Sequence, residues 1–291
     1  MQRRQFIVAG SAVAAATALR PGRLFAEEAA DASPIELKSG ELSVTVDPAA
    51  GGRVGALEYA GVSLIRTERD ENGWHWGGQM WPSPQRDWGW PPPAAIDSHP
   101  HRVVIRSDDT VTLRSDVDPK VGLSVTKTYR LLSPTQVWTS YRIHNHGDAP
   151  RDVAVWQTNR VPINGTILLP DDIDVRSEQR GEPSEPIVME RGDGHRTFEL
   201  SEELPDSTKL FVDVPDRTTP SLTLRRDGVQ WSIAVPTFGV DDAKAAPGES
   251  PLEIYFAIGD RFVELEVQAP LRRIEPGGEA GDGFVWNLRR I

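Results

Sequence analysis

The chain has 291 residues, 43 acidic against 32 basic, for a formal net charge of −11, and it contains no cysteine. This acidic balance disfavours nucleic acid and anionic membranes as partners. Without disulfides, the fold must be stabilised by its hydrophobic core alone.

Residues 1–26 are predicted to be a twin-arginine export signal. Arg3 and Arg4 open the run RRQFIV, a weakly apolar Ala-rich run follows, and Ala26 supplies a small residue for cleavage. An uncleaved N-terminal anchor is the alternative. Because the segment contains four Arg and no acidic residue, its removal takes the net charge from −11 to −15. We expect a periplasmic or secreted protein with a linker over 27–34 and no membrane association after cleavage, since no later apolar run reaches ~18 residues.

From residue 35 onward, apolar and polar residues alternate with a period of two, as in half-buried strands. The segment 221–235 is the clearest hairpin, with Asp227-Gly228 as a type I′ turn. The other predicted strands cover 35–38, 41–46, 53–59, 62–65, 101–106, 110–115, 121–132, 136–145, 151–159, 209–213, 252–258, 261–268 and 284–289.

Together these elements predict an all-β fold. The strands are too numerous for one small sandwich, which favours a single domain over 35–291 made of two large, mostly antiparallel sheets. Residues 171–206 are charged and rich in Pro and Gly. We expect them to form an irregular insertion rather than a second domain.

The stretch 72–97 interrupts the strands and holds five of the nine Trp. Its Pro and Gly residues exclude a helix and argue against a central strand, so a long loop is expected. One interpretation is the wall of a sugar site, since the CH face of a sugar stacks on an indole and its hydroxyls bond to nearby polar groups. The other is a loop that plugs the sandwich with its own Trp side chains.

A polar face is predicted on the strand 261–268. Period-two alternation puts Glu264, Glu266 and Gln268 on one side of the strand and apolar residues on the other. These three residues form either a solvated edge or the floor of a polar cleft.

Four segments, taken in order, resemble the aldose 1-epimerases, or galactose-mutarotase-like proteins. They are the opening Gly51-Gly52-Arg53, the loop Asn72 to Gly78 with its His75, the turn Asn145-x-Gly-Asp-x-Pro150, and the Glu266-x-Gln268 strand followed by a Pro276-Gly277 turn and a last strand with Trp286. The Gly-Gly-x-x-Trp-x-x-Pro pattern from Gly77 is similar to a poorly characterised exported branch of this superfamily, a domain of unknown function.

The resemblance implies a β-supersandwich with one sugar-binding cleft. It also implies that Glu266 acts as a base on the anomeric hydroxyl and His75 as an acid on the ring oxygen, with no cofactor and no metal. The substrate-binding residues expected on this basis are Trp76, Gln79, Trp81, Gln85, Trp88, Trp90, Gln157, Arg160 and Gln268. The ligand would be a mono- or oligosaccharide, and neither the sugar nor the oligomeric state is specified.

One departure from the family pattern concerns a central-strand His. The segment Val155 to Arg160 holds Gln157 where the family has that His, and an amide cannot act as an acid. Either His75 or Arg160 takes over part of the role, or the protein binds a glycan without turnover. A polysaccharide lyase or hydrolase on the same fold is a further alternative.

Two metal sites also need consideration. Asp97, His99 and His101 alternate along the chain and could point the same way. The acidic run 171–174 lacks a full calcium-loop pattern. Neither is preferred over the sugar site.

Overall fold

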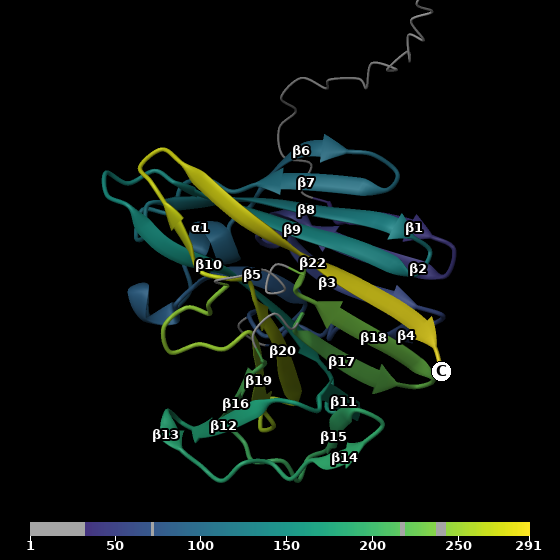
Figure 1. Ribbon diagram of the computed structural model, residues 1–291. Helices are drawn as coiled ribbons and strands as arrows, with labels where there is room; N and C mark the ends of the chain where they lie inside the picture. Colours follow the sequence, from purple (N-terminus) through teal and green to yellow (C-terminus); the bar gives the residue numbers. More distant parts are fainter. Residues whose placement is uncertain (1–32, 71–72, 216–218, 237–242) are drawn as a thin grey trace, which may run out of the picture.

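The computed structural model describes residues 33–70, 73–215, 219–236 and 243–291 (Figure 1). The predicted signal 1–26, most of the linker 27–34 and Asn72 lie outside these residues. Across the described ranges the chain forms two large sheets, and every strand pair is antiparallel. The predicted all-β, two-sheet supersandwich is therefore confirmed.

The first sheet has 12 strands and carries the cleft described below. In spatial order its strands are β1 (Ile35–Ser39), β2 (Leu42–Asp47), β3 (Arg53–Tyr59), β5 (Gly78–Ser83), β10 (Arg151–Val161), β20 (Phe262–Gln268), β19 (Leu252–Ala257), β16 (Thr208–Asp213), β12 (Asp174–Gln179) and β13 (Glu182–Pro183), with β4 (Val62–Ser63) beside β3 and β21 (Arg272–Ile274) beside β10.

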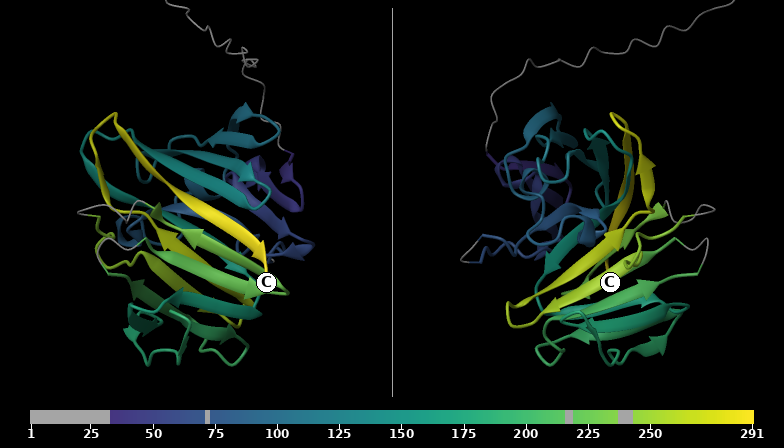
Figure 2. Two further views of the ribbon diagram at one scale, coloured as in Figure 1. Left: turned by 45° about the vertical axis from the view of Figure 1, so that its right-hand side comes forward. Right: turned by 90° about the vertical axis from the view of Figure 1, so that its left-hand side faces the viewer.

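The second sheet has 10 strands. Their order is β14 (Glu190–Gly192), β15 (His195–Leu200), β11 (Gly165–Pro170), β17 (Ser221–Arg226), β18 (Val229–Ala234), β22 (Glu279–Arg290), β9 (Gln136–Asn145), β8 (Leu123–Ser133), β7 (Thr110–Arg114) and β6 (Arg102–Arg106). Figure 2 shows β22, in yellow, crossing the molecule between β9 and β18. The described residues also include the short helical turns η1 (Pro48–Ala50), η2 (Gln85–Asp87) and α1 (Ala94–Asp97).

The core lies between the sheets and follows from the period-two alternation of the strands. On β20, Val263, Leu265 and Val267 are fully buried against the second sheet, where Trp231 and Trp286 pack edge to face at 5.2 Å. One cluster of buried apolar side chains extends along the chain from Ile35 to Leu288. The hairpin prediction is confirmed, because Asp227 and Gly228 have φ of 48° and 77°, as a type I′ turn requires.

The expectation that residues 171–206 are irregular is wrong. This segment forms β12, which pairs with β16 over six residue pairs, and β15, which pairs with β11 over six more. The strand pattern was missed because β12, with the sequence DVRSEQ, is largely polar on both faces and shows no apolar alternation.

The prediction of a continuous loop over 72–97 is also wrong. Gly78–Ser83 is a fully buried strand, paired with β10 from Asn159↔Gly78 to Ala154↔Ser83. On its other side β5 meets β3 only at Val54↔Gly78. With little pairing on that side, the strand tolerates Pro82, which lacks an N–H.

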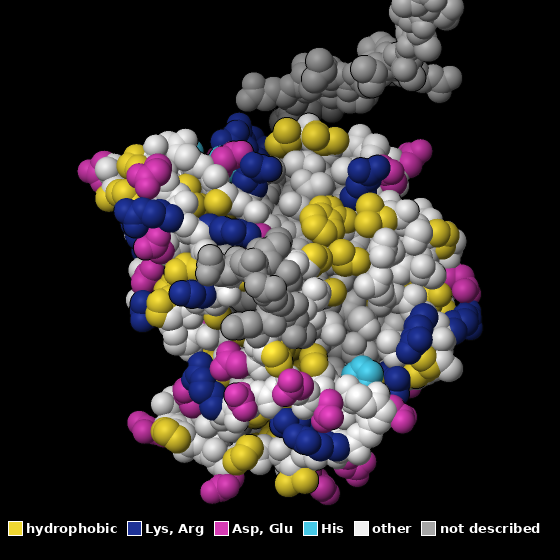
Figure 3. Space-filling model, viewed as in Figure 1, with side chains coloured by type: hydrophobic (Ala, Val, Ile, Leu, Met, Phe, Trp, Pro, Cys, Tyr) yellow, Lys and Arg dark blue, Asp and Glu magenta, His cyan; other side chains and the backbone are white. Residues whose placement is uncertain are grey.

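The surface in Figure 3 mixes charges of both signs, with acidic and basic side chains interspersed over the lower part of the view. Among the described residues, no helix is both long and apolar enough to cross a membrane.

Candidate functional site

A cleft of about 510 Å³ opens on the face of the 12-stranded sheet that points away from the core. Its volume lies within the range of small-molecule sites, about 300–1,000 Å³. Antiparallel partners share a face, so the pairs Thr158↔Glu266 and Arg160↔Glu264 project to the same side. The cleft is lined by His75, Trp81, Gln85, Trp90, Trp156, Arg160, Glu178, Arg180, Gly181, Ser207, Lys209, Phe211, Tyr255, Asp260, Phe262, Glu264 and Glu266.

Six of the residues predicted from the sequence line this cleft. They come from the Trp-rich stretch, β10 and β20 and are His75, Trp81, Gln85, Trp90, Arg160 and Glu266. The expected polar face of β20 thus forms part of the cleft floor rather than a solvated edge, with Glu266 only 1% exposed.

Gln157 does not line the cleft, because it occupies the opposite face of β10 from Trp156. It lies in the core, where its amide nitrogen donates to Thr139 Oγ1 and Tyr141 Oη and its oxygen accepts from Trp286 Nε1. Three core partners satisfy this amide, so a substrate contact through Gln157 is ruled out by its direction.

Four other predicted contacts are also buried beside the cleft rather than along it. Trp76 lies under Arg53 and Arg69, whose guanidinium carbons are 5.0 and 4.1 Å from its ring. Trp88 donates its indole N–H to Pro82 O at 2.6 Å. Gln268 accepts from Ser83 and donates to Glu253, and Gln79 is 2% exposed on β5. Both interpretations of the Trp-rich stretch therefore apply in part: Trp81 and Trp90 line the cleft, while Trp76 and Trp88 fill the interior.

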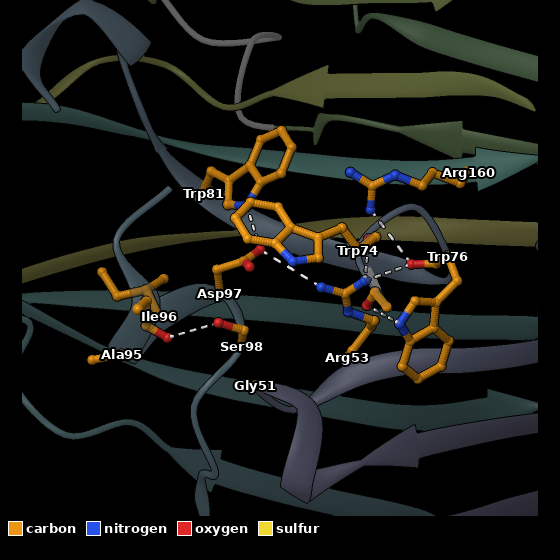
Figure 4. A network of polar contacts seen from close by, with 12 residues as sticks. Gly51, Arg53, Trp74, Trp76, Trp81, Ala95, Ile96, Asp97, Ser98 and Arg160 are labelled. Atoms are coloured by element: carbon orange, nitrogen blue, oxygen red, sulfur yellow. Dashed lines mark hydrogen bonds and ion pairs between the residues drawn. The ribbon is translucent and has the colours of Figure 1, made fainter. Parts of the chain in front are cut away.

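A buried polar network holds the Trp-rich stretch in place (Figure 4). Arg53 Nη1 donates to the carbonyls of Trp74 and Trp76, each at 2.8 Å, and the indole of Trp81 donates to Asp97 Oδ1 at 2.7 Å. Gly51 permits the close approach of η1 to α1, since a Cβ at this position would lie 2.0 Å from Asp97 O.

Lys209 is the central cation of the cleft. Its Nζ lies 2.6 Å from Glu253 Oε2 and 3.0 Å from Glu266 Oε2. The same oxygen of Glu266 accepts from the indole of Trp156 at 2.8 Å. Glu266 is thereby fixed by two donors at one oxygen.

These contacts shift the ionisation of both groups. Burial lowers the pKa of Lys209, but Glu253 and Glu266 outweigh burial and raise it above its ordinary value. Burial raises the pKa of Glu266 well above its usual range; Lys209 opposes this, and Glu253 and Glu264 add to it. A general base must be ionised to accept a proton, and Lys209, 3.0 Å from Glu266, favours the ionised form of this carboxylate.

A second set of charges lies in the cleft beside Glu266. Arg160 Nη2 lies 2.7 Å from Glu264 Oε1. His75 stacks on Phe262 at 5.2 Å, and its Nδ1 lies 2.6 Å from Asp70 Oδ2. Asp70 also accepts from the backbone N–H of Trp74; burial raises the pKa of Asp70, but this hydrogen bond and the charge of His75 together lower it below its ordinary value. His75 is thus oriented by a carboxylate, an arrangement that fixes the ring of an acid or base.

The metal alternatives find no support in the geometry. His101 Nε2 bonds to Ala95 O, and Asp97 is engaged by Trp81 and lies near Arg53. Within the described ranges, no group of three His, Cys, Asp or Glu is arranged to hold a metal ion.

Sequence reasoning missed several lining residues. Lys209 and Phe211 line the cleft and alternate with Leu210 and Val212 on β16. On β19, Tyr255 lines the cleft, and Glu253 pairs with Lys209. The period-two argument that was applied to β20 could have identified these positions. Glu178 and Arg180 belong to the segment that was expected to be irregular.

Comparison with solved structures defines the class of the fold. A galactose mutarotase-like protein from Lactobacillus casei matches with a TM-score of 0.65 and 12% identity over 88% of this chain and 100% of that chain. A galactose mutarotase-like protein from Clostridium acetobutylicum gives 0.60 and 12%, over 89% and 95%. A GalM/aldose epimerase homologue from C. elegans gives 0.56 and 15%, over 89% and 99%. The chain therefore has the galactose-mutarotase-like sandwich fold.

The family assignment is narrower. The model of a domain of unknown function, DUF4380, matches residues 72–289, so the chain belongs to this family. No curated protein matches the chain.

Proposed function

We propose that this protein binds a carbohydrate in the cleft beside Glu266. The observation that carries the proposal is the cleft's combination of aromatic side chains, among them the exposed Trp90 and the half-buried Tyr255, with fixed charged groups. Aromatic rings offer surface for the CH face of a sugar, while carboxylates and guanidinium groups bond its hydroxyls. The galactose-mutarotase-like fold supports the same class of ligand by analogy.

The proposal includes export to the periplasm or the medium. It rests on the paired Arg3 and Arg4 and the Ala-rich run that follows them. Protease accessibility of the protein in spheroplasts and its presence in the medium, with and without Arg3→Lys/Arg4→Lys, test it. A wild-type protein that is absent from the medium and fully protected in spheroplasts would contradict export.

Interconversion of sugar anomers is a second candidate function, favoured by the presence of Glu266 and His75 in one cleft. In this reaction Glu266 accepts the proton of the anomeric hydroxyl, and protonated His75 donates a proton to the ring oxygen. The bond between the anomeric carbon and the ring oxygen breaks as the carbonyl forms. Rotation about the carbon–carbon bond and the reverse steps give the other anomer.

Sugar binding is tested by titrating intrinsic Trp fluorescence with a panel of monosaccharides and oligosaccharides. We expect a saturable change in the wild-type protein that is strongly reduced in Trp90→Ala. Trp138→Ala is the matched control, because Trp138 lies on β9 outside the cleft lining. A flat response across the panel would overturn the proposal.

Turnover is tested separately by exchange NMR of the anomeric protons of each sugar that binds. Glu266→Gln preserves shape and the hydrogen bond from Trp156, but its side chain cannot accept the proton. We expect exchange to slow at least ~100-fold with binding retained. Equal exchange rates in the variant and the wild type would leave binding as the function and exclude Glu266 as the base.

A further inference from the structure

Four indoles form a continuous row from the floor of the cleft to the surface. Trp156 and Trp81 are 5.1 Å apart, Trp81 and Trp90 6.2 Å, and Trp90 and Trp74 5.9 Å, measured between ring centroids. The inner pair is buried, with Trp156 and Trp81 2% and 3% exposed, whereas the outer pair is exposed, with Trp90 at 56% and Trp74 at 42%. The aromatic surface therefore continues beyond the cleft lining.

The outer pair of this row differs from ordinary exposed apolar residues. Within the described ranges, Trp74 and Trp90 are the exposed side chains among Trp, Tyr and Phe. Isolated exposed apolar groups are common on proteins, but two touching indoles at the mouth of a cleft form a contiguous patch.

The backbone holds both indoles outward. Trp74 is fixed on two sides. Its carbonyl accepts from Arg53 Nη1 at 2.8 Å (Figure 4), and its N–H donates to Asp70 Oδ1 at 2.6 Å. Gly89 has φ of 61° and separates the buried Trp88 from the exposed Trp90. This left-handed turn, which glycine adopts readily, directs successive indoles to opposite sides.

The outer indole pair, Trp74 and Trp90, is also connected to His75, the candidate acid of the cleft. Asp70 accepts from the backbone of Trp74 through Oδ1 and pairs with His75 Nδ1 through Oδ2, at 2.6 Å in each case. A ligand ring seated on Trp74 would therefore lie along the same short segment that carries the cleft His.

We propose that Trp74 and Trp90 form a second carbohydrate subsite at the mouth of the cleft, so that the ligand is the end of an oligosaccharide or polysaccharide chain. This inference rests on the proposed sugar binding and extends it. A free monosaccharide would need only the inner cleft, whereas a chain that leaves the cleft meets Trp90 and then Trp74. The two indoles, 5.9 Å apart and tilted by 42°, offer two successive ring surfaces, and their exposure allows the chain to continue into solvent.

Isothermal titration calorimetry tests this with matched ligands, namely glucose, mannose, galactose and N-acetylglucosamine and a linear tetrasaccharide of each. We expect at least one tetrasaccharide to bind at least tenfold more tightly than its monosaccharide. Trp74→Ala should remove most of that difference, weakening the tetrasaccharide far more than the monosaccharide. Trp74→Phe, which keeps an aromatic face, should retain most of it.

The outcomes separate the two levels of the account. If mono- and tetrasaccharides bind equally, or if Trp74→Ala weakens both to the same degree or neither, the second subsite is overturned while sugar binding stands. If no ligand in the panel binds, the proposed function fails with it. Trp138→Ala should match the wild-type protein with every ligand, and circular dichroism checks that Trp74→Ala is folded.

Discussion

The side chains of Lys127 and Lys209 lie in very different surroundings. Lys127 is fully buried between the sheets and donates to two backbone carbonyls, Gly51 O at 2.7 Å and Ile96 O at 3.0 Å. Lys209 faces the cleft and lies within 3.0 Å of two carboxylates, Glu253 and Glu266.

The partners determine what each cation does. Burial lowers the pKa of Lys127 to about 7, with Asp97 opposing and Arg53 adding to the shift. A neutral amine has two hydrogens for its two carbonyls, so Lys127 fastens η1 to α1 whether or not it is charged. Lys209 has a raised pKa and neutralises carboxylates that would otherwise repel each other. The first lysine is structural, and the second sets the charge of the candidate site.

Removing the cleft cation should have the largest effect on stability. Lys209→Met leaves Glu253 and Glu266 buried without a counter-charge, so we expect the free energy of unfolding to fall by ~3–5 kcal/mol at neutral pH. The loss should shrink as the pH is lowered. The unpaired carboxylates of the folded variant then bind protons at a pH at which those of the unfolded chain are still ionised. Urea denaturation at pH 7.5 and 5.5 measures both effects. A loss that is independent of pH would contradict the electrostatic explanation.

The interior lysine should produce a different pH dependence. Its pKa is about 7 in the folded protein and ~10.4 when unfolded, so between these values the unfolded state binds the extra proton. Its contribution to the free energy of unfolding therefore rises with pH across this window, by at most ~1.4 kcal/mol per pH unit. Denaturation between pH 7.5 and 9.5 should show this slope in the wild-type protein and not in Lys127→Met. Parallel curves for the two proteins would mean that Lys127 is charged throughout.

The smallest effect on stability is expected at His75, whose ion pair with Asp70 is partly exposed. His75→Asn should change the free energy of unfolding by less than ~1 kcal/mol. If His75 is the acid, anomer exchange should nevertheless slow at least ~100-fold. His144→Asn is the matched control, since His144 pairs with Glu279 at 2.9 Å away from the cleft. Equal exchange rates in the two variants would remove His75 from the mechanism.

Strands β20 and β10 show what the sequence could and could not predict. Alternation identified most strands and the polar face of β20, because Glu264, Glu266 and Gln268 lie two residues apart on one strand. The side of the sheet that each β10 side chain faces was harder to predict. Trp156 and Gln157 are adjacent in sequence, yet Trp156 faces the cleft and Gln157 faces the core. A shift of one residue reverses the face of a strand.

The partners of Glu266 could not be predicted because they depend on strand order. Lys209 and Glu253 reach Glu266 only when β16, β19 and β20 lie side by side, and alternation within one strand does not specify its neighbours. The same holds for Glu178 and Arg180, which reach the cleft through the pairing of β12 with β16.

The most direct test of the central claim is a crystal structure of the protein with the sugar that binds most tightly in the titrations. The account predicts a sugar ring in the cleft, in contact with Trp90 and within hydrogen-bond distance of Glu266 or Arg160. A sugar bound on another face, or a cleft that stays empty at saturating ligand, would contradict it.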